Sequence, residues 1–592
     1  MNKLYSSIFF RHKDITLLLL LALVIIASGI GLRDPWPADE PRFVLIAKEM
    51  VESGQWLFPQ RGGELYPDKP PIFIWLQAIL YFLTHEIRAF LIPSLLASLG
   101  SVFLVYDLGR RLWNKTVGLY AAFALLASLQ FTMQSKLAQI DALLCFWVTL
   151  GLYGLLRHLL LGPQWTFYYL SFFSMGIGII TKGVGFLPVL LLPAAALFNA
   201  VQRRAYAKTV TSSQPINCAQ SIIIKPLSLS YGTKKSWFGW FFLLLPIMSW
   251  LIPMALTATD LGGVYANYRD NILLRQTVQR YASSWHHLKP FWFYILTVLP
   301  WAWFPLVLAF PLCVQLLKKR LWFKPNPRFF LLFAWIAFAI IFFSISKGKR
   351  GVYMLPTLPA LSLLMAPFLV TLRLNFNFQK VAFVLGVFIF VIIEAGVIAS
   401  IAGVIDLSVF SAGFQARLIY FGASFLMLFL GLLFYFRVRR GWFFLCSILL
   451  SVWFILPIFL YPHFNEIRTP LRVLHNIEKH SNLQTEIGMI NFREQFVLFS
   501  TFKMTHFGYH ALIKQQVHAA QCWQGKDEKN RFLLMSAEVA ADNFNQASER
   551  IDVGRAHGEN WVLVRGLSSI SKPDCAHAKT FTARVAQDGY KH

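Results

Sequence analysis

Residues 381–403, VAFVLGVFIFVIIEAGVIASIAG, form a continuous apolar run in which Glu394 is the only charged residue. A helix needs about 20 predominantly apolar residues to cross the hydrocarbon core of a bilayer. This run is long enough, so it predicts a membrane-spanning helix. Twelve further runs of the same kind predict an all-α, polytopic membrane protein. They lie at roughly 14–32, 88–107, 117–134, 139–156, 165–181, 184–201, 236–257, 290–316, 328–346, 351–372, 417–436 and 441–461.

The composition excludes a soluble chain. Of its 592 residues, 56% are hydrophobic and only 14% are charged, and the mean hydropathy is +0.54. A soluble domain is about 45–50% apolar and about 25% charged. A soluble chain of this length would fold as several domains, each with a polar surface. So few charges cannot provide those surfaces.

The apolar run from Pro71 to Thr84 is shorter than the others, and it lies between Lys69 and the pair His85-Glu86. It is too short to span a bilayer, but it suits a helix that lies in the membrane interface. We therefore expect an interfacial helix here. Counting it as a span would invert the orientation of everything that follows.

The chain carries 55 Lys and Arg against 28 Asp and Glu, a net charge of +27. In a soluble protein this excess would indicate nucleic acid. In a membrane protein it first indicates the positive-inside rule, so we expect no nucleic-acid partner and a cytoplasmic N-terminus. With that orientation, the inner loops carry most of the basic residues and almost no acids. Those residues include Arg110, Arg111, Lys115, Arg157, Arg203, Arg204, Lys208, Lys318, Lys319, Arg320, Arg373, Lys380, Arg437, Arg439 and Arg440.

The acidic residues gather instead in loop 33–87, which this orientation places outside. Thirteen spans also place residues 462–592 outside. We therefore predict a transmembrane domain over 1–461, including loop 33–87, and a small external α/β domain over 462–592. The short runs of this second part predict strands, and a polar stretch predicts a helix. The strands are Glu486–Ile490, Phe532–Met535 and Trp561–Val564, and the helix is Ser536–Arg550.

Of the six cysteines, only Cys522 and Cys575 share the external domain. A disulfide between them is compatible with an oxidising compartment. Their spacing matches no disulfide or zinc motif, so the sequence leaves their pairing open.

Positive charges on the outer side are unexplained by the orientation rule, and they mark the functional candidates. The first cluster is Asp39-Glu40-Pro41-Arg42-Phe43, followed by Asp68-Lys69. The pattern Arg42–Ser53 predicts an amphipathic helix on the membrane surface. Two interpretations stay open, because Asp39 and Glu40 could either serve chemistry or cap this helix.

Two further clusters lie on the outer side. The loop between the seventh and eighth spans contains Arg275, Arg280 and the pair His286-His287, which is more typical of a solvated loop than of a metal site. The third cluster is Lys347-Gly-Lys349-Arg350, followed by Tyr353. A bound phosphate or the acids of the first loop could compensate these cations. Asp141 and Lys182 at the membrane edge are equally compatible with structural and functional roles.

Carboxylates beside several cations at one membrane face suit a substrate with an anionic head and a lipid tail. Cations can stabilise a departing phosphate while a carboxylate removes a proton from the attacking group.

At these motifs the sequence resembles the bacterial lipid A aminoarabinose transferases. More broadly, it resembles the glycosyltransferases of the GT-C architecture that are related to dolichyl-phosphate-mannose–protein mannosyltransferases. The resemblance runs through most of residues 14–373. Six elements occur in the family's order: Asp39–Phe43, Asp68–Pro71 before Ile72–Trp75, Ile140-Asp141, Thr181–Gly183, Phe291–Tyr294, and Phe343–Lys349 with Tyr353–Pro356.

The resemblance implies transfer of a sugar, with inversion, from a polyprenyl (undecaprenyl) phosphate to lipid A or another envelope acceptor. The reaction would take place at the periplasmic face of the inner membrane. Asp39 would be the catalytic base. The donor phosphate would be held by Lys69, Arg280 and Tyr353, with Arg42 close by. Further candidates by position are Glu40, Asp68, Lys347, Lys349 and Arg350.

The sequence departs from the family pattern at three places. The family's Tyr is Phe43 here, and its Glu before the Lys is Asp68. The Glu-His element of the second large loop is missing from the run 275–280, where Arg275 could replace a metal's charge. We therefore predict no metal and no other cofactor.

Three alternatives stay open. The enzyme could resemble a protein O-mannosyltransferase, or the chain could be a flippase or exporter of lipid-linked sugars. A transporter would place polar residues at mid-membrane, whereas here they concentrate at one face. A structural scaffold would leave the external cations without a purpose.

Overall fold

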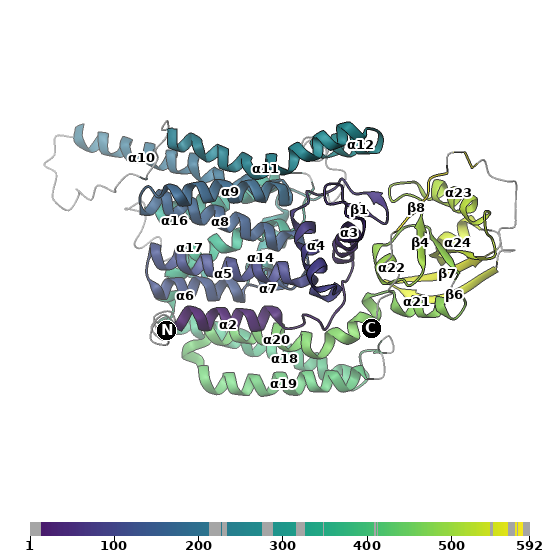
Figure 1. Ribbon diagram of the computed structural model, residues 1–592. Coiled ribbons are helices and arrows are strands. Elements are labelled where there is room, and N and C mark those ends of the chain that lie inside the picture. Colours follow the sequence, from purple (N-terminus) through teal and green to yellow (C-terminus); the bar gives the residue numbers. More distant parts are fainter. Residues whose placement is uncertain are drawn as a thin grey trace, which may run out of the picture.

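The computed structural model describes residues 13–211, 227, 234–274, 288–314, 326–346, 348–407, 410, 413–482, 484–544, 549–565, 575–576 and 578–583, and of residues 205–211 only the backbone. Each predicted span coincides with a helix or a set of consecutive helices, and these helices run side by side in one bundle (Figure 1).

The helices of the bundle have the following bounds. They are α2 (Lys13–Ala27), η1 (Ile87–Leu91) with α5 (Ile92–Leu112), α6 (Lys115–Ala127) with α7 (Leu129–Ser135), α8 (Ile140–Leu161), α9 (Trp165–Lys182), η2 (Val184–Leu190) with α10 (Leu191–Thr211), α11 (Lys234–Leu261) with α12 (Gly263–Asp270), η4 (Tyr294–Val298) with α14 (Leu299–Ala302) and η5 (Leu306–Ala309), α16 (Pro327–Ile345), η6 (Gly351–Met354) with α17 (Thr357–Leu372), α18 (Phe376–Ile401), α19 (Phe414–Phe436), and η7 (Val438–Arg440) with α20 (Gly441–Arg468).

The all-α membrane fold is confirmed, whereas the number of spans stays a prediction. Among the described residues, 8 helices are long and apolar enough to cross a membrane, or up to 10 if each of two bent pairs counts as one span. The bends are 68° between α6 and α7 and 103° after α14. Three predicted spans are not among these 8 helices and two bent pairs, and they correspond to α2, α9 and α17.

The bundle has an inner and an outer set of helices. In α8, 78% of the most apolar window is buried, compared with 22% in α18. α18 and α19 therefore present most of their apolar side chains outward, as helices in contact with lipid do. α5, α8 and α17 supply the bundle's packed interior instead.

The C-terminal part is an α/β domain with a mixed sheet of order β6-β7-β5-β3-β4-β8. Its central strand β3 is parallel to β4 and β5, and the other pairs are antiparallel. The elements are α21 (Leu471–Glu478), β3 (Glu486–Met489), α22 (Glu494–Phe499), β4 (Lys503–His506), α23 (Ile513–Gln524), β5 (Arg531–Ser536), α24 (Ala537–Asn543), β6 (Glu549–Ala556), β7 (Glu559–Arg565) and β8 (Phe581–Thr582).

The three predicted strands of this domain are confirmed as β3, β5 and β7. The predicted helix Ser536–Arg550 is wrong at its C-terminal end, because α24 ends at Asn543 and Glu549 begins β6. β6 hydrogen-bonds to β7, and this pairing provides a partner that a polar local pattern does not reveal.

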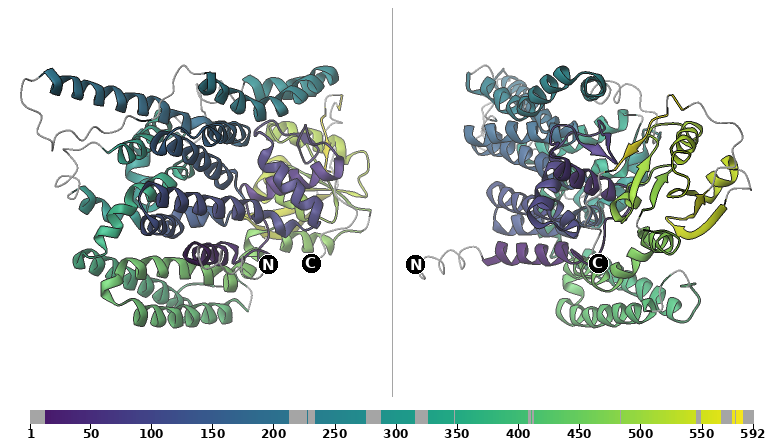
Figure 2. Two further views of the ribbon diagram at one scale, coloured as in Figure 1. Left: turned by 60° about the vertical axis from the view of Figure 1, so that its left-hand side comes forward. Right: turned by 45° about the vertical axis from the view of Figure 1, so that its right-hand side comes forward.

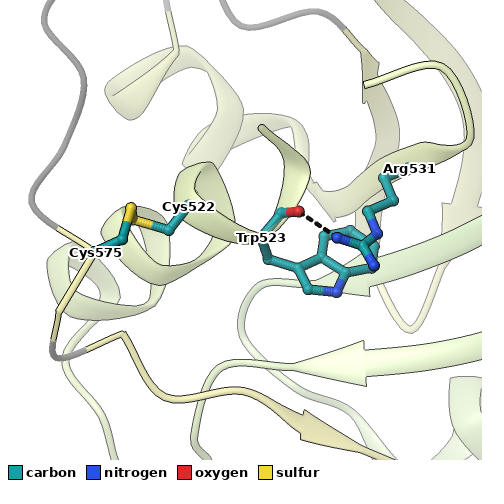
Figure 3. The surroundings of a disulfide bond; sticks show 4 residues. All are labelled: Cys522, Trp523, Arg531 and Cys575. Carbon is teal, nitrogen blue, oxygen red and sulfur yellow. Dashed lines mark hydrogen bonds between the residues drawn. A yellow bond between two sulfur atoms is a disulfide. The ribbon is translucent and has the colours of Figure 1, made fainter. Parts of the chain in front are cut away.

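Cys522 and Cys575 form a disulfide that joins α23 to the segment before β8 (Figure 3). Next to it, the Arg531 guanidinium lies over the Trp523 ring and donates a hydrogen bond to the Trp523 carbonyl at 2.7 Å. The pairing that the sequence left open is therefore present.

Loop 33–87 forms a layer between the bundle and the C-terminal domain (Figures 1 and 2). It contains α3 (Glu40–Ser53), the hairpin of β1 (Gln60–Arg61) and β2 (Glu64–Leu65), and α4 (Ile72–Thr84). The α4 helix buries one face and exposes Phe82 and Leu83 on the other, as an interfacial helix would.

The polar face of α3 differs from the expectation for a surface helix. Every residue from Glu40 to Met50 except Arg42 is buried, because α22 of the C-terminal domain packs on α3 and shares a core with it. The tip of the β1–β2 hairpin also contacts this domain. Gly62 and Gly63 have positive φ angles there, and a Cβ at Gly63 would lie 2.5 Å from the Thr582 carbonyl oxygen.

Candidate active site

Asp39 lies at the N-terminus of α3, but its side chain caps no backbone amide of that helix. Its carboxylate instead faces Arg42 of the same helix and two side chains from distant segments, Gln139 and Arg350. Gln139 donates to Oδ2 over 3.3 Å, Arg350 Nη2 lies 3.5 Å from Oδ2, and Arg42 Nη1 lies 3.6 Å from Oδ1. All three contacts are long, and the side chain stays 18% exposed. The Asp39 carboxylate is thus reachable and only weakly satisfied.

Glu40, the next residue, has the opposite environment. It is buried and forms a two-pronged pair with Arg33, at 2.5 and 2.6 Å. Its oxygens also accept hydrogen bonds from the backbone amides of Trp36 and Ala138, each at 2.9 Å. Four short donors leave this carboxylate little capacity for a substrate, so Glu40 fixes the start of α3 against the loop before α8.

Lys136, which the sequence analysis does not name as a candidate, lies next to the Arg33–Glu40 pair, and its carbonyl accepts a hydrogen bond from Arg33. Its ammonium is buried and donates to the Ser28 carbonyl at 2.7 Å and to the Ser28 hydroxyl at 2.8 Å. Burial, reinforced by the nearby Arg33 charge, lowers the pKa of Lys136 to about 7. A signal existed, because Lys136 is a cation in a loop that the orientation rule places outside.

Arg42 links Asp39 to the C-terminal domain. Its Nε donates to Glu494 Oε1 at 2.8 Å, and Glu494 itself is buried at the start of α22. The same oxygen lies 3.7 Å from Arg61 Nη1. Burial lowers the pKa of Arg42, but the Glu494 carboxylate and the nearby Tyr66 and Tyr509 side chains together raise it, so the net shift is upward. Glu494 therefore holds one cation beside Asp39, and nothing in its local sequence indicates this.

Asp141, Lys182 and Tyr353 come together at a second place, within the bundle. Lys182 Nζ lies 2.5 Å from Asp141 Oδ1 and 4.8 Å from the centre of the Tyr353 ring. The three residues come from the start of α8, the end of α9 and η6. The structure thus joins three elements of the family resemblance that lie far apart in the sequence.

Lys349 and Arg350 of the third cation cluster have different environments. Lys349 is buried and donates to the backbone carbonyls of Ser346 and Lys289, at 2.5 and 3.0 Å. Arg350 is partly exposed and contacts Asp39, which corresponds to the predicted pairing with an acid of the first loop. Lys347 and Arg280 lie outside the described residues, as do Arg275 and the pair His286-His287.

Asp68 and Lys69 are partly exposed in the turn between β2 and α4. Next to them, Tyr66 is buried, and burial together with the Asp68 charge raises its pKa. Over the described part of the chain, no group of three or more His, Cys, Asp or Glu side chains could hold a metal ion.

Comparisons with known proteins place this geometry in a family context. Residues 68–223 match the family model of dolichyl-phosphate-mannose-protein mannosyltransferase. The undecaprenyl phosphate-alpha-4-amino-4-deoxy-L-arabinose arabinosyl transferase of Yersinia enterocolitica is 28% identical over 60% of this chain, and that of Pseudomonas aeruginosa is 27% identical over 59%. The chain spans 59% of the length of each of these relatives.

The whole fold has a solved counterpart. The crystal structure of ArnT from Cupriavidus metallidurans bound to undecaprenyl phosphate superimposes with a TM-score of 0.69 over 95% of this chain and 99% of that one, at 16% identity. The chain has the ArnT fold. The match includes the C-terminal domain, because almost all of both chains is covered. The resemblance that the motifs indicate is therefore confirmed at the level of the fold, and the long apolar helices of this fold indicate an integral membrane protein.

Proposed function

We propose that the protein is an inverting glycosyltransferase that moves a sugar from an undecaprenyl phosphate donor to lipid A at the periplasmic face of the inner membrane. One observation carries the proposal. On the ArnT fold, the reachable carboxylate of Asp39 lies within 4 Å of two guanidinium groups, those of Arg42 and Arg350. This arrangement supplies both a base and a cationic environment for a phosphate leaving group.

In the proposed reaction, Asp39 accepts the proton of the acceptor's hydroxyl or phosphate oxygen. That oxygen forms a bond to the anomeric carbon as the bond from this carbon to the donor phosphate oxygen breaks. Undecaprenyl phosphate leaves with the bonding electrons. Its oxygen needs no acid, because phosphate is a stable anion and nearby cations stabilise the developing charge. Attack from the face opposite the leaving group inverts the anomeric carbon.

We assign donor-phosphate binding to Lys69, Tyr353 and Arg280, with Arg42 beside them. Two contacts support this assignment within the described chain. Arg42 is held 3.6 Å from Asp39, and Tyr353 carries the Lys182 ammonium against its ring. Glu40 and Lys349 are assigned to positioning, because their polar atoms already have short protein partners.

The C-terminal domain completes the site in this proposal. Its Glu494 orients Arg42, and its α22 covers α3. The domain therefore lies on the periplasmic side, with loop 33–87 between it and the membrane. The disulfide Cys522–Cys575 supports this side, because disulfides persist in oxidising compartments. The N-terminus is then cytoplasmic, and the division at residue 461 lies within α20, which continues to Arg468.

The test is turnover of radiolabelled undecaprenyl phosphate–sugar by the purified full-length protein, with lipid A as acceptor. We expect radiolabel in lipid A and stoichiometric release of undecaprenyl phosphate. Label in an added protein acceptor alone would favour the mannosyltransferase-like alternative. Movement of intact donor across proteoliposomes, without release of undecaprenyl phosphate, would overturn the proposal in favour of a flippase.

A further inference from the structure

A second arginine-lined site lies at the end of the bundle far from Asp39. α20 continues at its C-terminal end into the C-terminal domain, so its N-terminal end, preceded by η7, faces away from that domain (Figure 1). At this end the N-terminus of α18 and the C-terminus of α19 meet η7 around an open cavity of about 680 Å³. The cavity is lined by Phe376 and the consecutive residues 434–440.

The charges around this cavity have one sign. Arg437, Arg439 and Arg440 line it, and no carboxylate of the described residues does. None of the three forms an ion pair within the described part of the chain. The pair Arg110 and Arg111 at the end of α5 behaves differently, since Asp107 lies 2.7 and 2.5 Å from them. The three arginines therefore have donors available for an anion.

Aromatic side chains surround the arginines. Phe434 is 83% exposed, Tyr435 66% and Phe376 55%, which is unusual for rings this large unless they lie in a membrane interface. Below this collar, the outer faces of α18 and α19 stay apolar and exposed, for example at Phe388 and Met427. A chain of methylene groups could therefore continue along both helices from the cavity.

We propose that this cavity binds the headgroup of an anionic glycerophospholipid from the surrounding bilayer. The guanidinium groups donate to the phosphate oxygens, the aromatic collar surrounds the glycerol region, and the acyl chains lie along α18 and α19. The cavity volume falls in the range of about 300–1,000 Å³ that is typical of small-ligand sites. Basic pockets between helices on the cytoplasmic side are suited to such headgroups. This inference is independent of the proposed enzymatic activity.

The positive-inside rule is a competing explanation for these three arginines, because that rule requires only their positive charge. A binding site also requires the guanidinium geometry and the cavity. The two explanations differ in whether the arginines discriminate between phospholipids, and in whether other arginines at the same end of the bundle do the same.

The test is lipid binding by the full-length protein, measured by native mass spectrometry with phosphatidylglycerol and phosphatidylcholine of matched acyl chains. We expect at least about tenfold tighter binding of phosphatidylglycerol, and a loss of about tenfold in Arg437→Gln/Arg440→Gln. The control Arg203→Gln/Arg204→Gln removes the same charge from the exposed end of α10 and should bind like the unmodified protein. Equal affinity for both lipids, or an equal loss in the control, would overturn the proposal.

A second measurement remains decisive if the glutamine variant fails to fold. Photoactivatable phosphatidylglycerol should label the peptide that contains residues 434–440 in the unmodified protein. The variant Arg437→Lys/Arg440→Lys, which keeps the charge, should lose most of this label. Labelling that is spread evenly over the bundle, or unchanged in the lysine variant, would contradict a headgroup site.

Discussion

Asp39 and Glu40 are neighbours in the sequence, yet they belong to two regions of opposite character. The Asp39 region is partly exposed, and the contacts of Asp39 to Gln139, Arg350 and Arg42 span 3.3–3.6 Å. The Glu40 region is closed, with four contacts of 2.5–2.9 Å to a buried arginine and two backbone amides.

Under the proposed function, this difference lets one acidic pair serve both chemistry and folding. A buried carboxylate with all its lone pairs occupied contributes rigidity, and removing its charge leaves its arginine uncompensated. A carboxylate with long contacts keeps lone pairs available to accept a proton. The Glu40 region thus fixes the backbone from which Asp39 projects.

The largest effect is expected from Asp39→Asn. The amide cannot accept the acceptor's proton, so turnover should fall by about 10²–10⁴-fold while the protein folds normally. Radiolabelled-donor turnover and thermal unfolding measure the two quantities. The matched control is Asp270→Asn, which removes an exposed carboxylate at the end of α12 and should leave turnover unchanged.

Glu40→Gln should mainly reduce stability. The variant leaves the buried Arg33 charge without its carboxylate, at an expected cost of about 3–5 kcal/mol in the free energy of unfolding. Thermal unfolding in a fixed detergent measures this. The double variant Arg33→Gln/Glu40→Gln should recover part of the loss, because it no longer buries an unpaired charge. A Glu40→Gln protein as stable as the unmodified one would show that the pair is not structural.

Lys136 should make stability depend on pH. Its folded-state pKa of about 7 lies below the value of about 10.4 for a free lysine. Between these values the unfolded chain binds more protons, so stability should rise with pH above about 7, by up to about 1.4 kcal/mol per pH unit. Unfolding measured from pH 7 to 9 should show this rise in the unmodified protein and lose it in Lys136→Met. A rise that persists in the variant would assign it to other groups.

The smallest effect is expected from Glu494→Gln. Glutamine can still accept the hydrogen bond from Arg42 but loses the charge, so Arg42 should be held less firmly. We expect turnover to fall by about tenfold and the donor KM to rise, while the free energy of unfolding changes little. Glu559→Gln is the control, because Glu559 pairs with Arg493 at an exposed position of the same domain. Equal effects of the two variants would remove Glu494 from the site.

Most of the bundle could be predicted because a membrane span is a local property. The run 381–403 contains all the information needed for α18, and charge asymmetry between loops adds its direction. The strands β3, β5 and β7 were also visible as short apolar runs. The end of α24 was not, because β6 depends on pairing with β7 rather than on its own composition.

The site could be predicted only in part. Asp39 and Arg42 stand in a recognisable motif, and Lys182 stands out as an isolated cation. Glu494 lies 452 residues from Arg42, and no pattern around it indicates that contact. Long-range pairings of this kind depend on how the C-terminal domain packs on α3, which local periodicity does not encode.

The central claim is that neighbouring carboxylates divide chemistry from folding, and one paired measurement tests it most directly. Turnover of undecaprenyl phosphate–sugar is measured per folded molecule for Asp39→Asn and Glu40→Gln in the same assay. We predict an Asp39→Asn protein that is fully folded and at least about a hundredfold slower. We predict a Glu40→Gln protein that is poorly stable but whose folded fraction turns over within a few-fold of the unmodified rate. Full activity of the folded Asp39→Asn protein would contradict this division. A folded Glu40→Gln protein as inactive as Asp39→Asn would contradict it as well.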